Sequence, residues 1–188
     1  MSLEDTVMLA LLFAAGFASW GFVEYAIHGL LSHRFRTFVS PLHWQHHREP
    51  HAVFTAPLAW VPGALIAYVG LSLAIGPLAA GAVVLGLLSG FARYEYLHWR
   101  MHFRTPRNDR ERLLRSHHLA HHFRNPKVYC GVTTRLWDRV FGTLPDDWEH
   151  DYAAVADRPP LEGSSNIGVI WNPRFALERI RRARRHGV

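Results

Sequence analysis

Hydrophobic residues form long uninterrupted runs in the first half of the chain. Residues 6–23 contain no charged side chain, and residues 52–92 contain neither a charged side chain nor a histidine. A helix that crosses a bilayer needs about 20 apolar residues, so the second run is long enough for two helices with a turn at Gly76 and Pro77. The pattern predicts an all-α integral membrane protein with about three transmembrane helices, at residues 3–31, 58–75 and 78–101.

A signal peptide is the alternative interpretation of the first run. Signal peptides carry positive charge ahead of their apolar core. Here Glu4 and Asp5 precede the run, and Arg34 is the first basic residue of the chain. We therefore interpret this run as a membrane span.

The basic residues indicate how the spans are oriented. Of the 21 Lys and Arg residues, three lie in the first loop, at Arg34, Arg36 and Arg48, and all the others lie at or after Arg93. Loops rich in Lys and Arg stay on the cytoplasmic side of a membrane. We therefore expect the first loop and the C-terminal half in the cytoplasm, and the N-terminus on the opposite side.

Composition narrows the classes of function. The chain has 188 residues, of which 49% are hydrophobic and 19% are charged, and its net charge is +6. The positive charge flanks apolar spans without a phosphate-binding loop or a helix-turn-helix pattern, so lipid headgroups are the expected partner rather than nucleic acid. The single cysteine, Cys130, excludes an internal disulfide and a Cys-based zinc site, and is expected to be a packing residue.

We expect one domain over residues 1–188, in which a cytoplasmic, helical, histidine-rich cap follows the spans. Its catalytic part is predicted at residues 32–56 and 102–172, and a basic segment at 173–188. Residues 173–186 combine apolar and Arg residues in the pattern of a short amphipathic helix on an anionic membrane surface. A solvated basic end is the alternative for this segment.

Histidine is unusually frequent, with 14 copies. Ten of them form four clusters: His28-x4-His33, His43-x2-His46-His47, His98-x3-His102 and His118-x2-His121-His122. Residues i, i+3 and i+4 share a face of an α-helix, so three clusters should each present their imidazoles together. His28 and His33 are about 140° apart on an ideal helix, so either the helix distorts between them or they serve opposite sides of a site.

All four clusters lie at the cytoplasmic ends of the predicted spans or in the segments beside them. Imidazole is the commonest metal ligand in proteins, and so many histidines packed without a metal would repel one another when protonated. Ten ligands exceed the roughly four to six of a single ion, so the pattern predicts two metal ions. We interpret His51, His150 and His186 as surface residues, and His117 as either structural or orienting a ligand.

These motifs resemble those of the fatty acid hydroxylase / sterol desaturase superfamily of integral-membrane di-metal oxygenases. The resemblance runs over residues 24–144. It includes the segment Asn125 to Gly131 and the segment Leu136-Trp137-Asp138-Arg139-Val140-Phe141-Gly142-Thr143. Within the superfamily, the sequence segments HHFRNP and LWDRVFGT resemble those of fatty acid hydroxylases more than those of carotenoid hydroxylases.

The resemblance implies two iron ions that activate O2 and hydroxylate an unactivated C–H bond of a lipid or fatty acyl chain. By position in the motifs it implies as metal ligands His28, His33, His43, His46, His47, His98, His102, His118, His121 and His122. Zinc can replace iron in the purified protein, because imidazole suits both ions. The resemblance also implies a separate electron donor, a ferredoxin or a cytochrome b5-like protein, because no flavin fingerprint or iron–sulfur ligand set is present.

Two other functions fit the histidine pattern. The same type of site can desaturate a lipid, or act on a sterol or a carotenoid. A His-rich membrane metal transporter or sensor belongs to a different class. Transporters place ionisable ligands near the bilayer midplane, whereas here every ligand lies at one end of the spans, which favours an enzyme.

Three carboxylates are candidates to orient the ligands by accepting the second ring N–H. Glu24 precedes His28 by four residues and Glu95 precedes His98 by three, so each shares a helix face with its histidine. Asp138 is the candidate for the last cluster. Interfacial ion pairs are the alternative for Glu24 and Glu95, and a pair with a nearby arginine is the alternative for Asp138.

Basic and aromatic residues near the clusters are candidates for contacts with substrate and redox partner. The candidates to hold an anionic headgroup are Arg100, Arg104 and Arg124. A basic run is the candidate docking surface for an acidic electron carrier, with lipid phosphates as the alternative: Arg104, Arg107, Arg110, Arg112 and Arg115. Three aromatic residues either line a lipid channel or belong to the core: Trp44, Tyr94 and Trp137.

Overall fold

The structure is a computed structural model that describes residues 1–35 and 37–165, and all regular secondary structure in this part is helical. The order is α1 (Leu3–Tyr25), the π-helix η1 (Ala26–Arg34), α2 (Ser40–Arg48), α3 (Pro57–Ile75), α4 (Pro77–Phe103), α5 (Asp109–Phe123), α6 (Leu136–Val140) and α7 (Trp148–Val155). The predicted all-α class is confirmed. The predicted amphipathic segment 173–186, with His186, lies outside the described residues.

Three helices are long and apolar enough to cross a membrane: Leu3–Arg34, Pro57–Ile75 and Pro77–Phe103. Their ends differ from the predicted spans by at most three residues. The chain reverses between the second and third helices at Gly76, whose φ of 84° favours glycine. Pro77 then begins α4, where its fixed φ suits the first turn of a helix.

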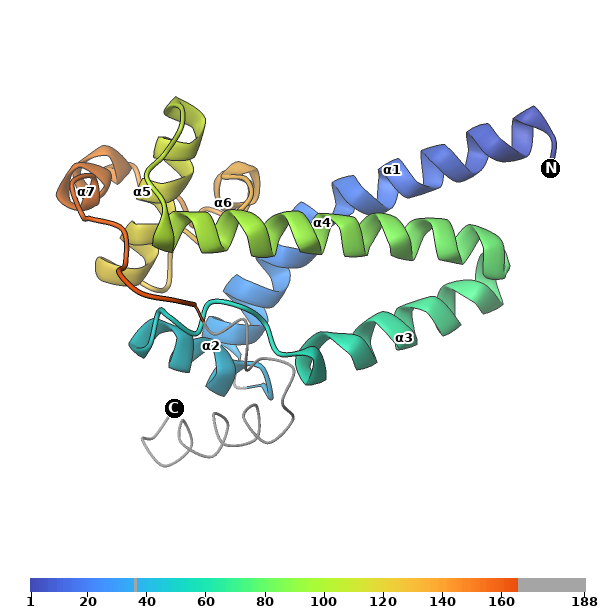
Figure 1. Cartoon of the computed structure of the whole chain (residues 1–188), viewed down its shortest axis with the longest axis horizontal. Coiled ribbons are helices and arrows are strands. Elements are labelled where there is room, and N and C mark those ends of the chain that lie inside the picture. Colours follow the sequence, from blue (N-terminus) through green and yellow to red (C-terminus); the bar gives the residue numbers. More distant parts are fainter. Residues whose placement is uncertain (36, 166–188) are drawn as a thin grey trace.

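Helices α1 and α4 approach closely because glycines remove side chains from their interface. A Cβ atom on Gly16 would lie 2.2 Å from the carbonyl oxygen of Val83, and one on Gly86 would lie 2.1 Å from that of Phe13. Small residues are the usual means by which helices pack closely in membranes. In Figure 1 the three long helices extend together to one side of the molecule.

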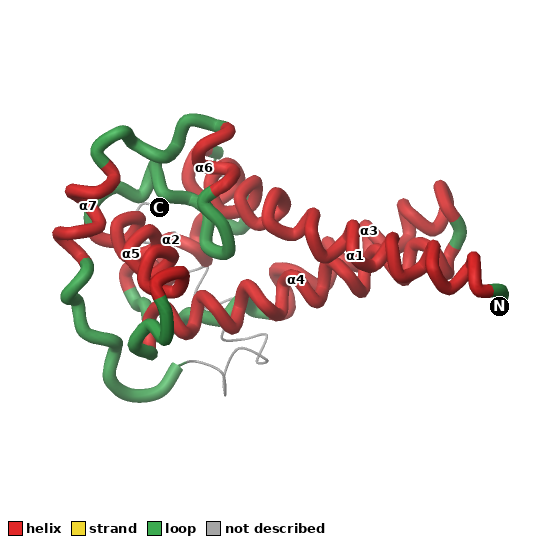
Figure 2. The backbone as a smooth tube through the Cα atoms, turned by 90° about the horizontal axis from the view of Figure 1, so that it is seen from above, coloured by secondary structure: helices red, strands yellow, loops and turns green. Residues whose placement is uncertain are grey.

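The shorter helices form a cap at the other end of the long helices, as Figures 1 and 2 show. Helices α5 and α7 pack around a small apolar core that includes Leu119, Tyr129 and Tyr152. A second apolar cluster joins the end of α4 to α5 through Met101 and Leu114. The cap therefore assembles η1, α2, α5 and the last turns of α4, which are the segments that carry the histidine clusters.

Candidate metal centre

The ten clustered histidines come from these four helical segments and meet inside the cap. They gather into two groups of five, and in each group the candidate ligand atoms lie within 4.8 Å of one another. Group 1 contains His28, His33, His43, His47 and His121. Group 2 contains His46, His98, His102, His118 and His122. The structure thus brings together every residue of the predicted ligand set, whereas His51 and His150 are exposed, as predicted.

Each HxxHH motif supplies both groups. On α2, His43 and His47 belong to group 1 and His46 belongs to group 2; on α5, His121 belongs to group 1, and His118 and His122 belong to group 2. Residues four apart lie above one another on a helix, and the neighbouring residue is turned by about 100° toward the other group. The rings of His47 and His122 stack across the boundary between the groups, with their centroids 4.2 Å apart.

The π-helix η1 explains how His28 and His33 reach the same group. A π-helix forms i→i+5 hydrogen bonds, which bring residues five apart onto one face. At the end of η1 the N–H of Phe35 donates to the carbonyl of Leu30 at 2.8 Å, which is a bond of this type. Of the two alternatives that the spacing left open, the structure has the distorted helix, and the two histidines need not serve opposite sides.

The Nε2 atoms of group 1 are too close together for hydrogen bonds alone to explain. Nε2 of His43 lies 2.7–3.1 Å from the Nε2 atoms of three neighbours, His28, His33 and His47. A neutral Nε2 either donates one proton or accepts at one lone pair, so it cannot bond to three such neighbours at once. Ligands at right angles around an ion with bonds of about 2.1 Å are about 3.0 Å apart, which matches these spacings.

Burial keeps the imidazoles neutral, which is the form that binds a metal ion. Burial above all, and then neighbouring histidines, lower the pKa of His47 to about 3. The same causes hold the pKa well below its usual value at His43, His118, His121 and His122. Both ring nitrogens of His122 are buried and have no hydrogen-bond partner among the described residues. An ion in group 2 would satisfy Nε2 of this ring, so the donor set fits a metal.

Backbone carbonyls of one loop orient two of the group 1 histidines. Nδ1 of His28 donates to the carbonyl of Cys130 at 2.5 Å, and Nδ1 of His121 donates to that of Val128 at 2.8 Å. Donation from Nδ1 leaves the lone pair on Nε2, the atom that faces the group. Sequence reasoning missed this role, because a backbone carbonyl has no residue-type signature; the family-like segment 125–131 was the available signal.

An apolar cavity of about 410 Å³ lies beside the two groups, between α1, α3 and α4. Histidines of both groups form part of its wall: His28, His43, His46 and His98. Toward the spans it is lined by side chains such as Trp60, Leu87 and Phe91. The cavity therefore leads from the histidines into the part of the molecule that is apolar enough to lie in a membrane.

The sequence model of the fatty acid hydroxylase family matches residues 13–143, a range that includes all ten clustered histidines. The chain belongs to the fatty acid hydroxylase family. It is 32% identical over 162 residues to fatty acid 2-hydroxylase of Mus musculus, covering 80% of this chain and 43% of that protein. It is 32% identical over 146 residues to a dihydroceramide fatty acyl 2-hydroxylase of Arabidopsis thaliana, covering 73% and 62%.

A solved structure of full-length scs7p, in which only the hydroxylase domain is visible, has a similar fold. The TM-score is 0.68 at 25% sequence identity, over 84% of this chain and 60% of that chain. The chain thus spans about half the length of the relatives it matches. The resemblance inferred from the histidine motifs is confirmed.

In this member of the fatty acid hydroxylase family, the two glutamates expected to orient ligands bind loops instead. Glu24 accepts hydrogen bonds from the N–H of Val132 and from the N–H and hydroxyl of Thr133, the last at 2.6 Å. Glu95 accepts from the N–H and hydroxyl of Thr55, at 2.9 and 2.8 Å. Among the described contacts, neither forms the expected bond to the histidine on its own helix face, because each carboxylate turns toward the backbone donors of a loop.

Asp138 is the centre of a buried network rather than the partner of a clustered histidine. Its carboxylate accepts from four donors: the ring of His117 and the hydroxyl of Thr143, and the N–H groups of Cys130 and Gly131. Burial opposes its ionisation, but the bonds from His117, Thr143 and Gly131 hold its pKa below the usual value. No arginine is among these described partners, so a hydrogen bond from the ring of His117 takes the place of the ion pair considered for Asp138.

His117 lies outside both histidine groups and belongs to this network. Burial lowers its pKa, so the ring is neutral. Nε2 then donates to Asp138 at 3.0 Å, and Nδ1 accepts from the hydroxyl of Tyr152 at 2.5 Å. Both ring nitrogens are used, so His117 is not a candidate ligand.

The predicted basic docking surface is smaller than expected. Arg115 is buried and donates to the carbonyls of Met101 and Arg158, so it is not part of a docking surface. Other arginines are engaged within the cap: Arg100 and Arg107 with Glu111, Arg124 with Asp151, and Arg104 with the ring of Trp99. No arginine lines the cavity formed by the described residues, so the three headgroup candidates are not at its wall.

The remaining candidates divide between packing and the cavity. Cys130 packs as predicted: its buried Sγ would lie 3.1 Å from a Cβ on Gly29, and burial raises the pKa of the thiol to about 12. Tyr94 lines the cavity and stacks on the ring of His98. Trp44 packs on group 1 rings and Trp137 on an aromatic side chain of α1, so these two serve the core.

Proposed function

We propose that this protein hydroxylates an unactivated C–H bond in the acyl chain of a membrane lipid, with two iron ions held by groups 1 and 2. The observation that carries the proposal is that histidines of both groups form part of the wall of an apolar cavity between the spans. An acyl chain in that cavity would present its C–H bonds to the histidine end. The names of the relatives, which are fatty acid and fatty acyl 2-hydroxylases, support this reaction.

Iron is the proposed metal because the reaction needs a redox-active ion that imidazole binds well. When bound, the two ions would supply the O2 chemistry that side-chain acids and bases cannot perform. The protein contributes two sets of buried, neutral nitrogens that hold the ions next to the cavity. Elemental analysis of the purified protein distinguishes iron from zinc.

The chain's own residues bind and orient the acyl chain and exclude water. Trp20, Phe91 and Tyr94 line the cavity, and their ring centroids are 5.3–6.2 Å apart, so they form one aromatic wall. This wall ends at His98, on which Tyr94 stacks at 5.4 Å. The wall therefore holds the acyl chain on a path that passes the histidines.

We further propose carbon 2 of the acyl group as the position attacked. Both named relatives are 2-hydroxylases. Attack at this carbon would place the acyl carbonyl near the histidine end, with the rest of the hydrocarbon in the apolar part of the cavity. Product analysis separates this reaction from desaturation or from oxidation of a sterol or carotenoid.

The histidine end is proposed to face the cytoplasm, where a separate electron carrier supplies the two electrons of each turnover. The bias of Lys and Arg toward this end supports the orientation. Arg110 and Arg112, both exposed on α5, are the proposed docking candidates, although Arg112 also pairs with the exposed Asp109. Reporters fused to each terminus test the orientation, and a cytoplasmic N-terminus would refute it.

Mass spectrometry of host membrane lipids tests the reaction. Cells grown with O2 carry the unmodified chain, the His121→Ala variant or an empty vector. The proposal predicts lipids heavier by one oxygen atom only with the unmodified chain. Lipids lighter by two hydrogen atoms would favour the desaturase alternative, and an unchanged lipid profile with altered cellular metal content would favour a transporter.

A further inference from the structure

The two histidine groups differ in how their rings are held. In group 1, the carbonyls of Cys130 and Val128 accept hydrogen bonds from Nδ1 of His28 and His121. In group 2, no described residue forms a hydrogen bond with the buried Nδ1 atoms of three rings, His98, His118 and His122, a condition that His33 of group 1 shares. Both accepting carbonyls belong to one short loop, residues 128–131, so a single segment orients both of these group 1 rings.

This loop has a constrained backbone. Tyr129 has a φ of 60°, which is uncommon for a residue other than glycine, and its N–H donates to the carbonyl of Thr143 at 2.9 Å. Gly131 has no room for a side chain, because a Cβ there would lie 2.1 Å from the carbonyl oxygen of Thr134 and 2.8 Å from Oδ2 of Asp138. Such a conformation persists only where the surrounding structure stabilises it.

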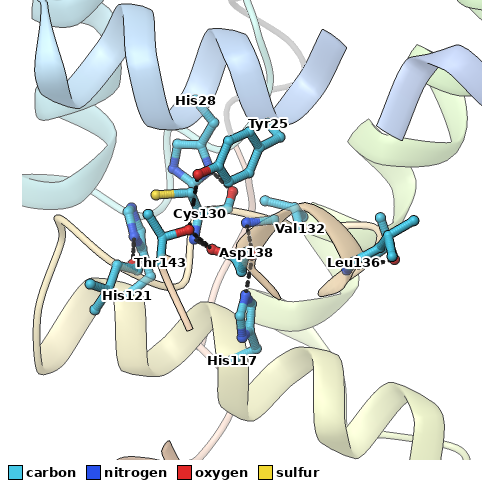
Figure 3. A network of polar contacts seen from close by, with 12 residues as sticks. Tyr25, His28, His117, His121, Cys130, Val132, Leu136, Asp138 and Thr143 are labelled. Atoms are coloured by element: carbon cyan, nitrogen blue, oxygen red, sulfur yellow. Dashed lines mark hydrogen bonds and ion pairs between the residues drawn. The ribbon is translucent and has the colours of Figure 1, made fainter. Parts of the chain in front are cut away.

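Asp138 supplies that stabilisation. Oδ1 accepts from the N–H of Cys130 at 2.7 Å and Oδ2 from the N–H of Gly131 at 2.8 Å. The ring of His117 and the hydroxyl of Thr143 complete its contacts, and the side chain is fully buried. In Figure 3 Asp138 lies between His117 on one side and Cys130 on the other, with His28 beyond Cys130.

We propose that Asp138 is a positioning residue that makes group 1 bind its metal ion more tightly than group 2. This inference rests on the proposed function, in which both groups hold an ion. An acceptor for the second ring N–H orients a metal-binding histidine and raises its basicity, and its loss typically costs about 10- to 100-fold in metal affinity. Asp138 acts on two of the five group 1 rings at once, because both of their acceptors belong to the loop that it holds.

Two variants of the full-length chain, each of which keeps only one histidine group, test the proposal. Both are purified in detergent and stripped of metal, and each serves as a background for further substitutions. His98→Ala with His102→Ala and His118→Ala leaves group 1, and His33→Ala with His43→Ala and His47→Ala leaves group 2, because two remaining imidazoles are too few for a zinc site. Titration with Zn²⁺ against a competing chelator gives the dissociation constant of each. We expect the group 1 background to bind Zn²⁺ about 10-fold more tightly or better, since carbonyls accept from two of its rings, whereas no described residue accepts from Nδ1 of His98, His118 or His122.

Asp138→Asn is then added to each background. An amide presents one oxygen where the carboxylate presents two, so it cannot accept both loop N–H groups. Zn²⁺ binding should weaken about 10- to 100-fold in the group 1 background and less than about twofold in the group 2 background. A purely structural defect would weaken both backgrounds alike.

Two further variants complete the design. Tyr152→Phe removes only the hydroxyl that holds His117, so it should weaken group 1 in the same direction by a smaller factor. It carries the test if Asp138→Asn does not fold. Glu111→Gln is the control, because it breaks ion pairs with Arg100 and Arg107 that do not involve the loop, and it should leave both constants unchanged.

The outcomes separate this inference from the proposed function. Equal affinity of the two backgrounds, or an equal loss in both after Asp138→Asn, would overturn the positioning role while leaving the metal centre in place. If neither background nor the unmodified chain binds Zn²⁺, the metal centre itself is wrong.

Discussion

The membrane-spanning helices and the cap are stabilised in opposite ways. No residue of α3 is buried, and its Leu73 and Ile66 are 87% and 74% exposed, which leaves them for lipid to cover. In the cap the most deeply buried side chains include polar ones such as His117, His121 and Asp138. A lipid-facing helix surface needs only apolar side chains, and specific contacts are required only where glycines let two helices pack closely. In the cap, by contrast, each buried polar group needs a particular hydrogen-bond partner. Substitutions in the cap should therefore reduce stability and activity far more than substitutions along the spans.

Loss of a single group 1 histidine should give the largest effect. His121→Ala removes a buried ring at the centre of the cap, and hydroxylated lipid should fall by at least about 100-fold, together with bound metal. The matched control is His150→Ala, because His150 is exposed on α7 and lies outside both groups. Lipid mass spectrometry and elemental analysis measure the two quantities. If His121→Ala and His150→Ala lost equal amounts of hydroxylated lipid and bound metal, the grouped histidines would be no more important than a surface histidine.

Acid should destabilise the cap before it affects the spans. In metal-free protein, burial and neighbouring histidines lower the pKa of His47 to about 3, against a usual value of about 6.5. Between these pH values the unfolded chain binds more protons than the folded chain, so the free energy of unfolding should fall as pH decreases from about 6.5 toward 3. Near-ultraviolet circular dichroism should lose the cap signal while far-ultraviolet helix signal from the spans persists. Simultaneous loss of both signals would contradict the comparison.

Along the apolar parts of the spans, the glycine contacts between α1 and α4 should be the most sensitive positions. Gly86→Leu places a side chain against the backbone of α1, 2.1 Å from the carbonyl oxygen of Phe13, and should cost about 3 kcal/mol of unfolding free energy. Gly81→Leu on the same helix is the matched control, since a Cβ there meets no described atom within 4 Å. Thermal unfolding in detergent compares the two. If both variants unfold at the same temperature, the contact between α1 and α4 is looser than described.

The smallest effect is expected where a span meets the cap. Glu24→Gln keeps the shape of the side chain but weakens the acceptor for three donors from Val132 and Thr133, and should cost about 1–2 kcal/mol. The exposed Glu149→Gln on α7 is the control, with no expected change. Thermal unfolding measures both. A loss greater than that of Gly86→Leu would reverse the predicted order.

The spans and the ligand types were predictable because their signals are local. The length of a span can be counted directly from its run of apolar residues, so the ends of the predicted spans lie within three residues of the ends of the observed helices. The spacing of His28 and His33 also required a distorted helix or two separate roles, and η1 supplies the distortion. The partners of Glu24 and Glu95 were not predictable, because a shared helix face does not say which loop will pack beside a carboxylate.

Three apolar spans, ten imidazoles at one end of them and the family of the chain all follow from local patterns in the amino-acid sequence. How the histidines divide into two groups, where the cavity lies and which carbonyls hold the rings follow only from the packing of distant segments. These two kinds of feature differ in the separation of the interacting residues along the chain. Helical periodicity and composition act over a few residues, whereas the bond from His28 to Cys130 joins residues 102 positions apart and exists only once the cap has packed against η1.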